Sequence, residues 1–168
     1  MNNIEVYVKN TLKVLLRTID VNKLKIDIKI ENPKEAGQDR LINAYAIKKM
    51  KLDPAIIIDF GTATTFDVVG VGGSYLGGII APGINLSVES LYQATSRLPK
   101  VSVKTLKNEK ETLVGKNTIS AIESGIFWGY VCMIEGLIKK IKKYHKNSKI
   151  IATGGLSQIF KNNIKSID

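Results

Sequence analysis

The stretch that decides the fold of this chain is Ala55-Ile56-Ile57-Ile58 followed directly by Asp59-Phe60-Gly61-Thr62-Ala63-Thr64-Thr65-Phe66-Asp67. The β-branched run predicts a buried strand, and Gly61 lets the backbone turn sharply where that strand ends. Amides and hydroxyls that converge at such a turn can donate hydrogen bonds to phosphate oxygens, while Asp59 can hold a cation. The alternative is a β-hairpin with a threonine-rich second strand, and spacing alone leaves both interpretations open.

Helical and strand periodicities alternate along the rest of the chain, which predicts an α/β fold. A turn at residues 71–73 would join the second and third strands of a three-strand meander. The predicted helices cover residues 3–17, 33–50, 84–94 and 117–144. The predicted strands cover residues 24–30, 55–58, 65–69, 74–79, 98–103 and 149–152, and a charged loop is predicted at 108–111.

Composition is that of a soluble globular chain: 168 residues with 44% hydrophobic and 24% charged side chains fit one domain. No apolar stretch is predicted to span a membrane and no signal segment begins at Met1, so the expected compartment is the cytosol. The only cysteine, Cys132, is predicted to be a buried, inert thiol. The only histidine, His145, lies among lysines, which argues against a histidine-based metal site or catalytic triad.

The net charge of +10 raises the possibility of nucleic-acid binding. Six lysines cluster at the end of the longest predicted helix, where they complement the helix dipole and form a solvated face. No aromatic platform, zinc-ligand spacing or helix-turn-helix pattern accompanies them. We therefore expect no nucleic-acid partner; attraction of an anionic substrate and lysine-rich genome composition both remain open as reasons for the charge.

Glycines mark two further places. Gly125, Gly129 and Gly136 interrupt the longest helix, at a cost of about 1 kcal/mol each, which predicts either close packing against another backbone, such as a second subunit, or a bent helix. Gly154 and Gly155 follow the last strand, a position that suits close approach of a nucleotide.

A series of motifs in a fixed order resembles the type III pantothenate kinase family from about Lys29 onward. The motifs are Glu31-Asn32-Pro33-x-Glu35-x-Gly37-x-Asp39-Arg40, Asp59 to Asp67, Tyr75-Leu76-Gly77-Gly78-x-x-Ala81-Pro82-Gly83, Leu98-Pro99-x-Val101, Gly115-Lys116-Asn117-Thr118, Ser124-Gly125-Ile126-Phe127-x-Gly129-Tyr130 and Ala152-Thr153-Gly154-Gly155. Apart from a few extra residues before Gly115, their separations match the family's.

The resemblance implies an actin-like ATPase architecture, in which two ribonuclease-H-like lobes, each a central mixed sheet flanked by helices, hold ATP between them. Residues 1–50 would carry the remainder of the first lobe with the substrate motif, and residues 51–168 the second lobe. The implied reaction is ATP-dependent phosphorylation of pantothenate, the first step of coenzyme A biosynthesis. Mg²⁺ and a monovalent cation, K⁺ or NH₄⁺, would serve as cofactors, and the family normally works as a homodimer.

The same resemblance assigns roles to individual residues. Asp39 would be the general base, although a carboxylate there also suits the helix dipole. Gly37, Gln38, Arg40 and Thr118 would join it in binding pantothenate; Arg40 alone could be a surface ion-pair residue, and Thr118 a helix cap. Asp59 would support the monovalent cation. Gly61, Thr62, Gly154 and Gly155 would contact ATP.

Three departures from the family pattern qualify these expectations. Nothing ahead of Asp39 matches the family's Asp-x-Gly-Asn-Thr phosphate loop, so the chain is expected to lack most of the first lobe, and also the extreme C-terminus. Ile30 stands where the family has tyrosine, and Gln38 replaces an alanine. The alternatives are a kinase completed by a separate first-lobe polypeptide, an inactive remnant or accessory regulator, and a generic actin-like sugar or acetate kinase, which the Gly-x-Asp-Arg and Gly-Lys-Asn-Thr segments argue against.

Overall fold

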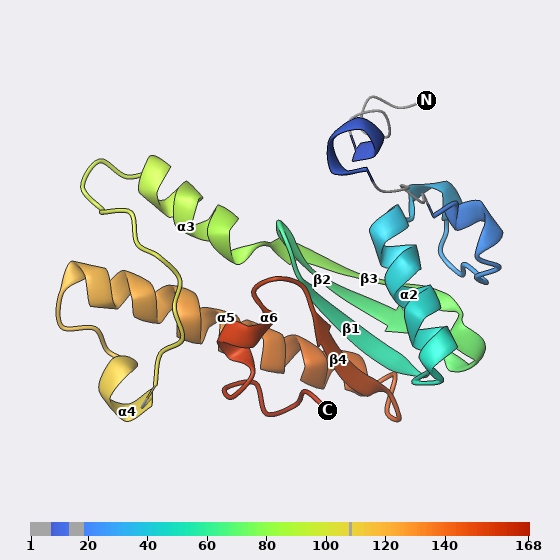
Figure 1. Ribbon diagram of the computed structural model, residues 1–168. Coiled ribbons are helices and arrows are strands. Elements are labelled where there is room, and N and C mark those ends of the chain that lie inside the picture. The colour runs from blue at the N-terminus through green and yellow to red at the C-terminus, as the bar shows by residue number, and fades with distance from the viewer. Residues whose placement is uncertain (1–7, 14–18, 108) are drawn as a thin grey trace.

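A four-stranded mixed sheet lies at the centre of the computed structural model, which describes residues 8–13, 19–107 and 109–168 (Figure 1). The strands are β1 (Ala55–Phe60), β2 (Ala63–Val69), β3 (Tyr75–Pro82) and β4 (Lys149–Thr153), in the order β3-β2-β1-β4. β1 pairs with β2 and β2 with β3 in antiparallel fashion, whereas β4 pairs with β1 in parallel. The predicted meander and the α/β class are confirmed.

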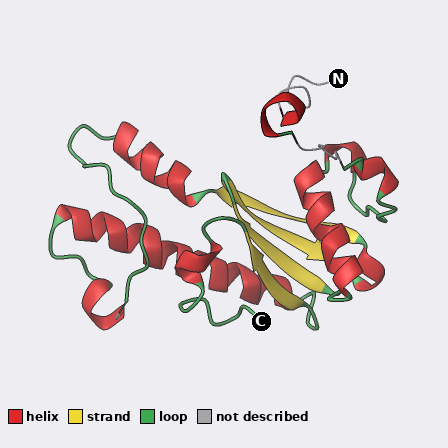
Figure 2. Ribbon diagram, in the orientation of Figure 1, coloured by secondary structure: helices red, strands yellow, loops and turns green. Residues whose placement is uncertain are grey.

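Helices cover both faces of this sheet (Figure 2). The long helix α5 (Thr118–Lys142) lies on one face and α2 (Gln38–Met50) on the other. α3 (Ile84–Gln93) continues from β3 and runs beside α5, with which it makes contacts. The short elements are α4 (Glu109–Thr112), α6 (Ser157–Phe160), the 3₁₀ turns Val21–Lys23, Pro33–Glu35 and Val71–Gly73, and the π turn Val8–Leu12.

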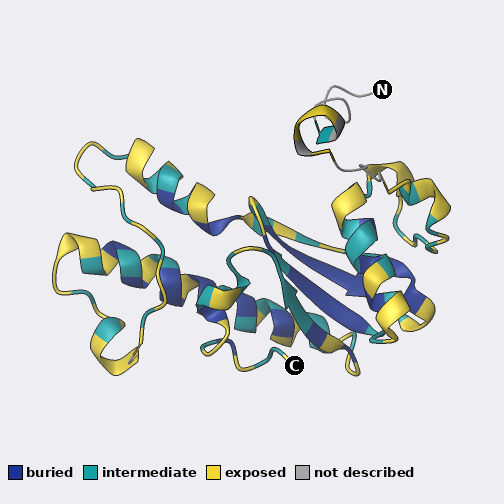
Figure 3. Cartoon of the chain, in the orientation of Figure 1, coloured by how far each residue is buried: buried dark blue, intermediate teal, exposed yellow. Residues whose placement is uncertain are grey.

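The continuous apolar run in β1 has a structural cause, because successive side chains of a strand point to opposite faces. Ile56, Ile58 and Phe60 face α5, whereas Ala55 and Ile57 face α2. All five are buried, and Figure 3 shows the buried residues concentrated in the sheet and on the inner side of α5. β1 therefore contributes to two separate hydrophobic clusters, one on each face.

Aromatic side chains join the C-terminal segment to the α5 face of the sheet. Phe160 of α6 stacks on Phe60 of β1 and on Phe127 of α5, with ring centroids 5.4 and 5.3 Å apart. All three rings are buried. Phe160 therefore anchors the segment after β4 to both the sheet and α5.

The N-terminal third differs from the sequence prediction. Residues 24–30 form no named strand: a single parallel bridge joins Ile28 to Tyr75. Ile26, Ile28 and Ile30 nevertheless pack against the α2 cluster, as their alternation predicted. The second predicted helix begins at Gln38, after a 3₁₀ turn that starts at Pro33. The predicted helix over 3–17 lies largely outside the described residues.

Two predictions between α3 and α5 are wrong. Residues 98–103 form no strand and pair with none of the described strands, and Glu109–Thr112 is a short helix where a loop was expected. Two predictions on α5 itself need correction as well. Cys132 is exposed, because it lies on the face turned away from the sheet. α5 is also long and apolar enough to cross a membrane, although one side of it packs on the sheet as a core helix does.

Gly125, Gly129 and Gly136 share that outer side of α5. A Cβ at any of the three would meet no atom within 4 Å. The predicted close approach of another backbone is therefore absent within the described part of this chain, and a second subunit remains a prediction.

Candidate functional site

The first half of α2 lies over the sheet where β1 and β2 carry two aspartates. Arg40 and Asn43 are three residues apart on the helix and so share a face. The Nε of Arg40 donates to Oδ1 of Asp67 at 2.6 Å, and Nδ2 of Asn43 donates to Oδ2 of Asp59 at 3.1 Å. Both aspartates occupy positions of their strands that face α2, as the neighbouring Ile57 does. One helix face therefore holds both carboxylates.

Asp67 is a buried carboxylate with three donors. It is fully inaccessible to solvent, and besides Arg40 it accepts hydrogen bonds from the Tyr75 hydroxyl at 3.1 Å and from Thr65 Oγ1 at 3.0 Å. The Arg40 guanidinium also lies over the Tyr75 ring, 5.5 Å from its centroid. A buried charge is tolerated when it is paired and hydrogen-bonded in this way.

Asp59 lies at the end of β1, beside the end of β4. Gly154, just beyond β4, has a φ of +91°, and a Cβ on it would lie 2.5 Å from Asp59 Oδ1 and 2.6 Å from the Phe60 nitrogen. Only glycine permits this approach. The exposed residues Gly61 and Thr62 form the adjacent β1–β2 turn, and Gly155 is exposed as well. The four predicted ATP-contacting residues thus gather with Asp59 at one end of the sheet.

The threonine hydroxyls of the stretch Asp59 to Asp67 differ in exposure and in hydrogen bonding. Thr62 is exposed in the turn. Thr65 is buried and donates to Asp67, and the fully buried Thr64 hydroxyl has no partner among the described residues. The observed β1–β2 pair is a hairpin with a threonine-rich second strand, so only Thr62 keeps a hydroxyl at the turn.

The predicted pantothenate-contacting residues, except Thr118, lie where α2 begins. Gly37 is the N-cap residue of α2, and Gln38 and Asp39 are exposed in its first turn. A Cβ at Gly37 would lie 2.6 Å from Asp39 Oδ1, so that carboxylate folds back over the glycine. Burial raises the pKa of Tyr75 far above its usual value, and the negative charges of Asp67 and Asp39 add to this effect. The charge of Asp39 therefore acts on Tyr75, whose hydroxyl donates to Asp67.

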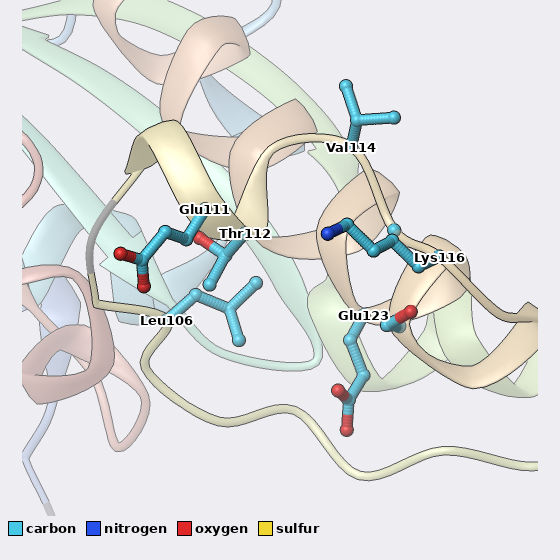
Figure 4. A pocket seen from close by; sticks show the side chains of 8 residues that line it. Leu106, Glu111, Thr112, Val114, Lys116 and Glu123 are labelled. Carbon is cyan, nitrogen blue, oxygen red and sulfur yellow. The ribbon is translucent and has the colours of Figure 1, made fainter.

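Thr118 is placed elsewhere. It is the first residue of α5, at the end of that helix which lies away from the sheet (Figure 1), after an Asn117 capping box. It lines a hollow of about 590 Å³ between α3 and α5. A second hollow, of about 230 Å³, lies beside it, and Figure 4 shows Lys116 and Glu123 on one side of it and Leu106 and Glu111 on the other. This chain does not bring Thr118 to Asp39.

Sequence reasoning missed part of the cluster. Asn43, Thr65 and Tyr75 were not assigned to a site, and Asp67 appeared only as the end of a motif. The available signal was the helical spacing of Arg40 and Asn43, together with the period-two spacing of Asp59, Thr65 and Asp67 on paired strands. Both spacings place the residues on one side of their element.

Tyr75 leads to a prediction about alkaline stability. In the folded protein the pKa of the Tyr75 phenol is raised well above 10.0, so the phenol stays neutral. Its contribution to the free energy of unfolding is therefore complete below pH 10. That contribution declines as the pH rises further, because the phenol of the unfolded chain ionises first. The free energy of unfolding should fall by about 1 kcal/mol per pH unit more steeply above pH 10 in the native protein than in Tyr75→Phe.

Urea unfolding between pH 8 and 11 measures this difference. Tyr144→Phe is the matched control, because Tyr144 is 85% exposed. Equal slopes for the native protein and Tyr75→Phe would contradict the raised pKa.

Comparison with known proteins shows which family the chain resembles. The model of a family described as type III pantothenate kinase matches residues 1–140. Type III pantothenate kinase of Caulobacter vibrioides is 46% identical over 147 residues, which are 87% of this chain and 56% of that protein. The Acidiphilium cryptum enzyme of the same name is 52% identical over 133 residues, 79% of this chain and 48% of its own length. The chain spans about half the length of the curated relatives it matches.

Among solved structures, a conserved putative Baf family transcriptional activator from Campylobacter jejuni has the same fold. Its TM-score is 0.59 at 23% identity, over 99% of this chain and 70% of that one. The family match over most of the sequence and the identities above 40% agree with each other. The chain belongs to the type III pantothenate kinase family.

Proposed function

We propose that this protein phosphorylates pantothenate at the expense of ATP, giving 4'-phosphopantothenate and ADP, the first step of coenzyme A biosynthesis. The observation that carries the proposal is that the first half of α2 carries Asp39 and Arg40 and also holds Asp59, through Asn43, in a chain of the type III pantothenate kinase family. Transfer of a phosphoryl group to an anionic alcohol uses a free carboxylate as base, a cationic side chain for the alcohol's negative charge, and a strand-end carboxylate for a metal cation.

In the proposed step the pantothenate hydroxyl oxygen forms a bond to the γ-phosphorus of ATP. The bond from that phosphorus to the β,γ-bridging oxygen breaks, and ADP leaves with its electron pair. Asp39 accepts the hydroxyl proton. Its exposure in the first turn of α2 leaves the carboxylate accessible to an alcohol.

ATP would lie along the end of the sheet formed by β1 and β4, against Gly61, Thr62, Gly154 and Gly155. Asp59 fits a cation there, since Asn43 occupies one carboxylate oxygen and the other faces Gly154. No group of three or more acidic, histidine or cysteine side chains surrounds it within the described residues. A cation would therefore take its other ligands from phosphate and water. Mg²⁺ and K⁺ or NH₄⁺ would offset the phosphate charge when bound.

The finer architecture belongs to the same proposal. The similarity to the Campylobacter jejuni structure and the family membership support an actin-like arrangement, with residues 51–168 as a second ribonuclease-H-like lobe and residues 1–50 as the remainder of the first. A homodimer would offer Thr118 to a second copy of the site. A separate first-lobe polypeptide could supply the family's phosphate loop, and we place the enzyme in the cytoplasm.

Turnover tests the proposal directly. The chain is incubated with ATP, Mg²⁺ and K⁺, and ADP is measured with and without pantothenate. We expect ADP release that depends on pantothenate and falls when Na⁺ replaces K⁺. If turnover appears only after a first-lobe fragment is added, the chain is one part of a split kinase.

The second candidate is a catalytically inactive or accessory regulatory protein of the same family. It is favoured by one specific observation: the only motif in the chain that resembles a phosphate loop is the hairpin at Asp59–Thr62, in which a single threonine hydroxyl is exposed. Absence of pantothenate-dependent ADP release, both alone and with the fragment, would favour this candidate.

A further inference from the structure

Only the Nε of the Arg40 guanidinium has a recorded hydrogen-bond acceptor in the described part of the chain. Its Nε side is bound by Asp67 at 2.6 Å and its plane lies over the Tyr75 ring. Among the residues that the structure describes, Asp67 is its only recorded acceptor, and its terminal nitrogens are not enclosed. The side chain is 15% exposed. A nearly buried guanidinium whose two outer nitrogens still need acceptors is suited to an anion that reaches it end-on.

Asp67 fixes the direction of those nitrogens. Its carboxylate is itself fixed by the Tyr75 hydroxyl on Oδ1 and the Thr65 hydroxyl on Oδ2, and it is completely buried. Gly78 completes the arrangement, because a Cβ there would lie 2.7 Å from Arg40 Nη2 and 2.0 Å from the Phe66 carbonyl oxygen. The guanidinium therefore has Asp67 at its Nε, the Tyr75 ring against its plane and Gly78 close to its Nη2.

We propose that Asp67 is a positioning residue that aims Arg40 at the carboxylate of the acceptor alcohol, and that the Arg40–Asp67 pair selects a hydroxy acid over the corresponding uncharged alcohol. This inference rests on the proposed function, since it concerns the acceptor of that reaction. Two parallel N–H donors match the two oxygens of a carboxylate, whereas a neutral hydroxyl accepts only one of them. Arg40 and Asp39 are adjacent in sequence, so an acceptor held through its carboxylate is held beside the proposed base.

Binding to a pair of ligands tests this proposal without turnover. Isothermal calorimetry with a non-hydrolysable ATP analogue measures the affinities of pantothenate and of pantothenol, in which a hydroxymethyl group replaces the carboxylate. We expect the native chain to bind pantothenate at least ten-fold more tightly. Asp67→Asn should lose most of this preference while its affinity for pantothenol stays unchanged.

The direction of the Asp67→Asn effect separates positioning from simple electrostatics. Removing a negative charge next to Arg40 would strengthen the binding of an anion if Asp67 acted only through its charge. The positioning role predicts weaker binding of pantothenate instead. A stronger or unchanged preference for pantothenate in Asp67→Asn overturns the proposal.

Two further variants keep the test decisive. Tyr75→Phe removes one hydrogen bond from Asp67 but keeps the ring beneath Arg40, so a reduction of the preference by about three-fold is expected even if Asp67→Asn fails to fold. Asp53→Asn is the matched control: its carboxylate accepts a hydrogen bond from the Gly72 amide at 2.8 Å, before the start of β1, and the preference should not change.

Each outcome decides one of the two proposals. Equal affinities for both ligands in the native chain, or no binding of either, overturn the role of the Arg40–Asp67 pair. Carboxylate-dependent binding without pantothenate-dependent ADP release leaves that role standing and contradicts the proposed kinase activity.

Discussion

Replacing Asp39 by asparagine is expected to lower pantothenate-dependent turnover by about 10²- to 10⁴-fold, the usual contribution of a positioned general base. The amide keeps the shape of the side chain but has no basic oxygen to accept the hydroxyl proton. Because Asp39 is exposed and accepts no recorded hydrogen bond within the described residues, the substitution should leave the fold intact. Steady-state ADP release measures the effect, with the loss expected in kcat.

The control for this prediction is Asp27→Asn. Asp27 is also an exposed aspartate, and its only recorded side-chain partner in the described part of the chain is the exposed Lys29 at 3.3 Å. Turnover should be unchanged there. If Asp39→Asn retained turnover within a factor of a few, Asp39 would not be the base, and positioning and charge neutralisation would account for the reaction.

The second large effect is on stability. Phe160→Ala is expected to lower the free energy of unfolding by about 3–5 kcal/mol, the usual cost of removing a fully buried phenylalanine. Phe160 is 0% exposed and stacks on both Phe60 and Phe127, so its removal leaves a cavity between β1, α5 and α6. Urea denaturation followed by the fluorescence of Trp128, whose ring meets that of Phe127 edge to face, reports the change.

Phe160→Leu provides the graded comparison, because leucine fills much of the same volume, and it should cost less than the alanine variant. A denaturation midpoint that stays at the native value in Phe160→Ala would show that α6 does not pack against the sheet.

The sheet and its main helices could be predicted from the sequence because each has a strong local pattern. Ile56, Ile57 and Ile58 are buried on alternate faces, and the apolar stripe of α5 includes the buried Ile122, Phe127 and Ile134. Residues 98–103 have a comparable strand pattern but no strand in the structure. A strand forms only where its backbone pairs with another strand, and local sequence carries no information about that pairing.

Some residues of the candidate site could also be identified from the sequence, and others could not. The Gly37–Arg40 motif, Asp59 and Gly154 were identified as candidates from their motifs, and the structure places them around the first half of α2 and the adjacent ends of β1 and β4. Their roles remain predictions. The Asp67 network could not be predicted, since Arg40 and Asp67 are 27 residues apart and meet only through packing of α2 on β2. Cys132 shows the reverse error: an apolar neighbourhood in sequence did not reveal which side of α5 faces the sheet.

The order of the strands also bears on how the chain is made. β1 receives β2 immediately, through a tight hairpin, but its other edge is filled only by β4, which begins at Lys149. During synthesis, α2 and the β1–β3 meander can therefore assemble before β4 and α5 are made. At that stage β1 has an unpaired edge, and the face of the sheet that α5 later covers is still exposed. Such a distant pairing forms late, and an exposed apolar edge is prone to aggregate in the meantime. The newly made protein should depend on chaperones until β4 leaves the ribosome.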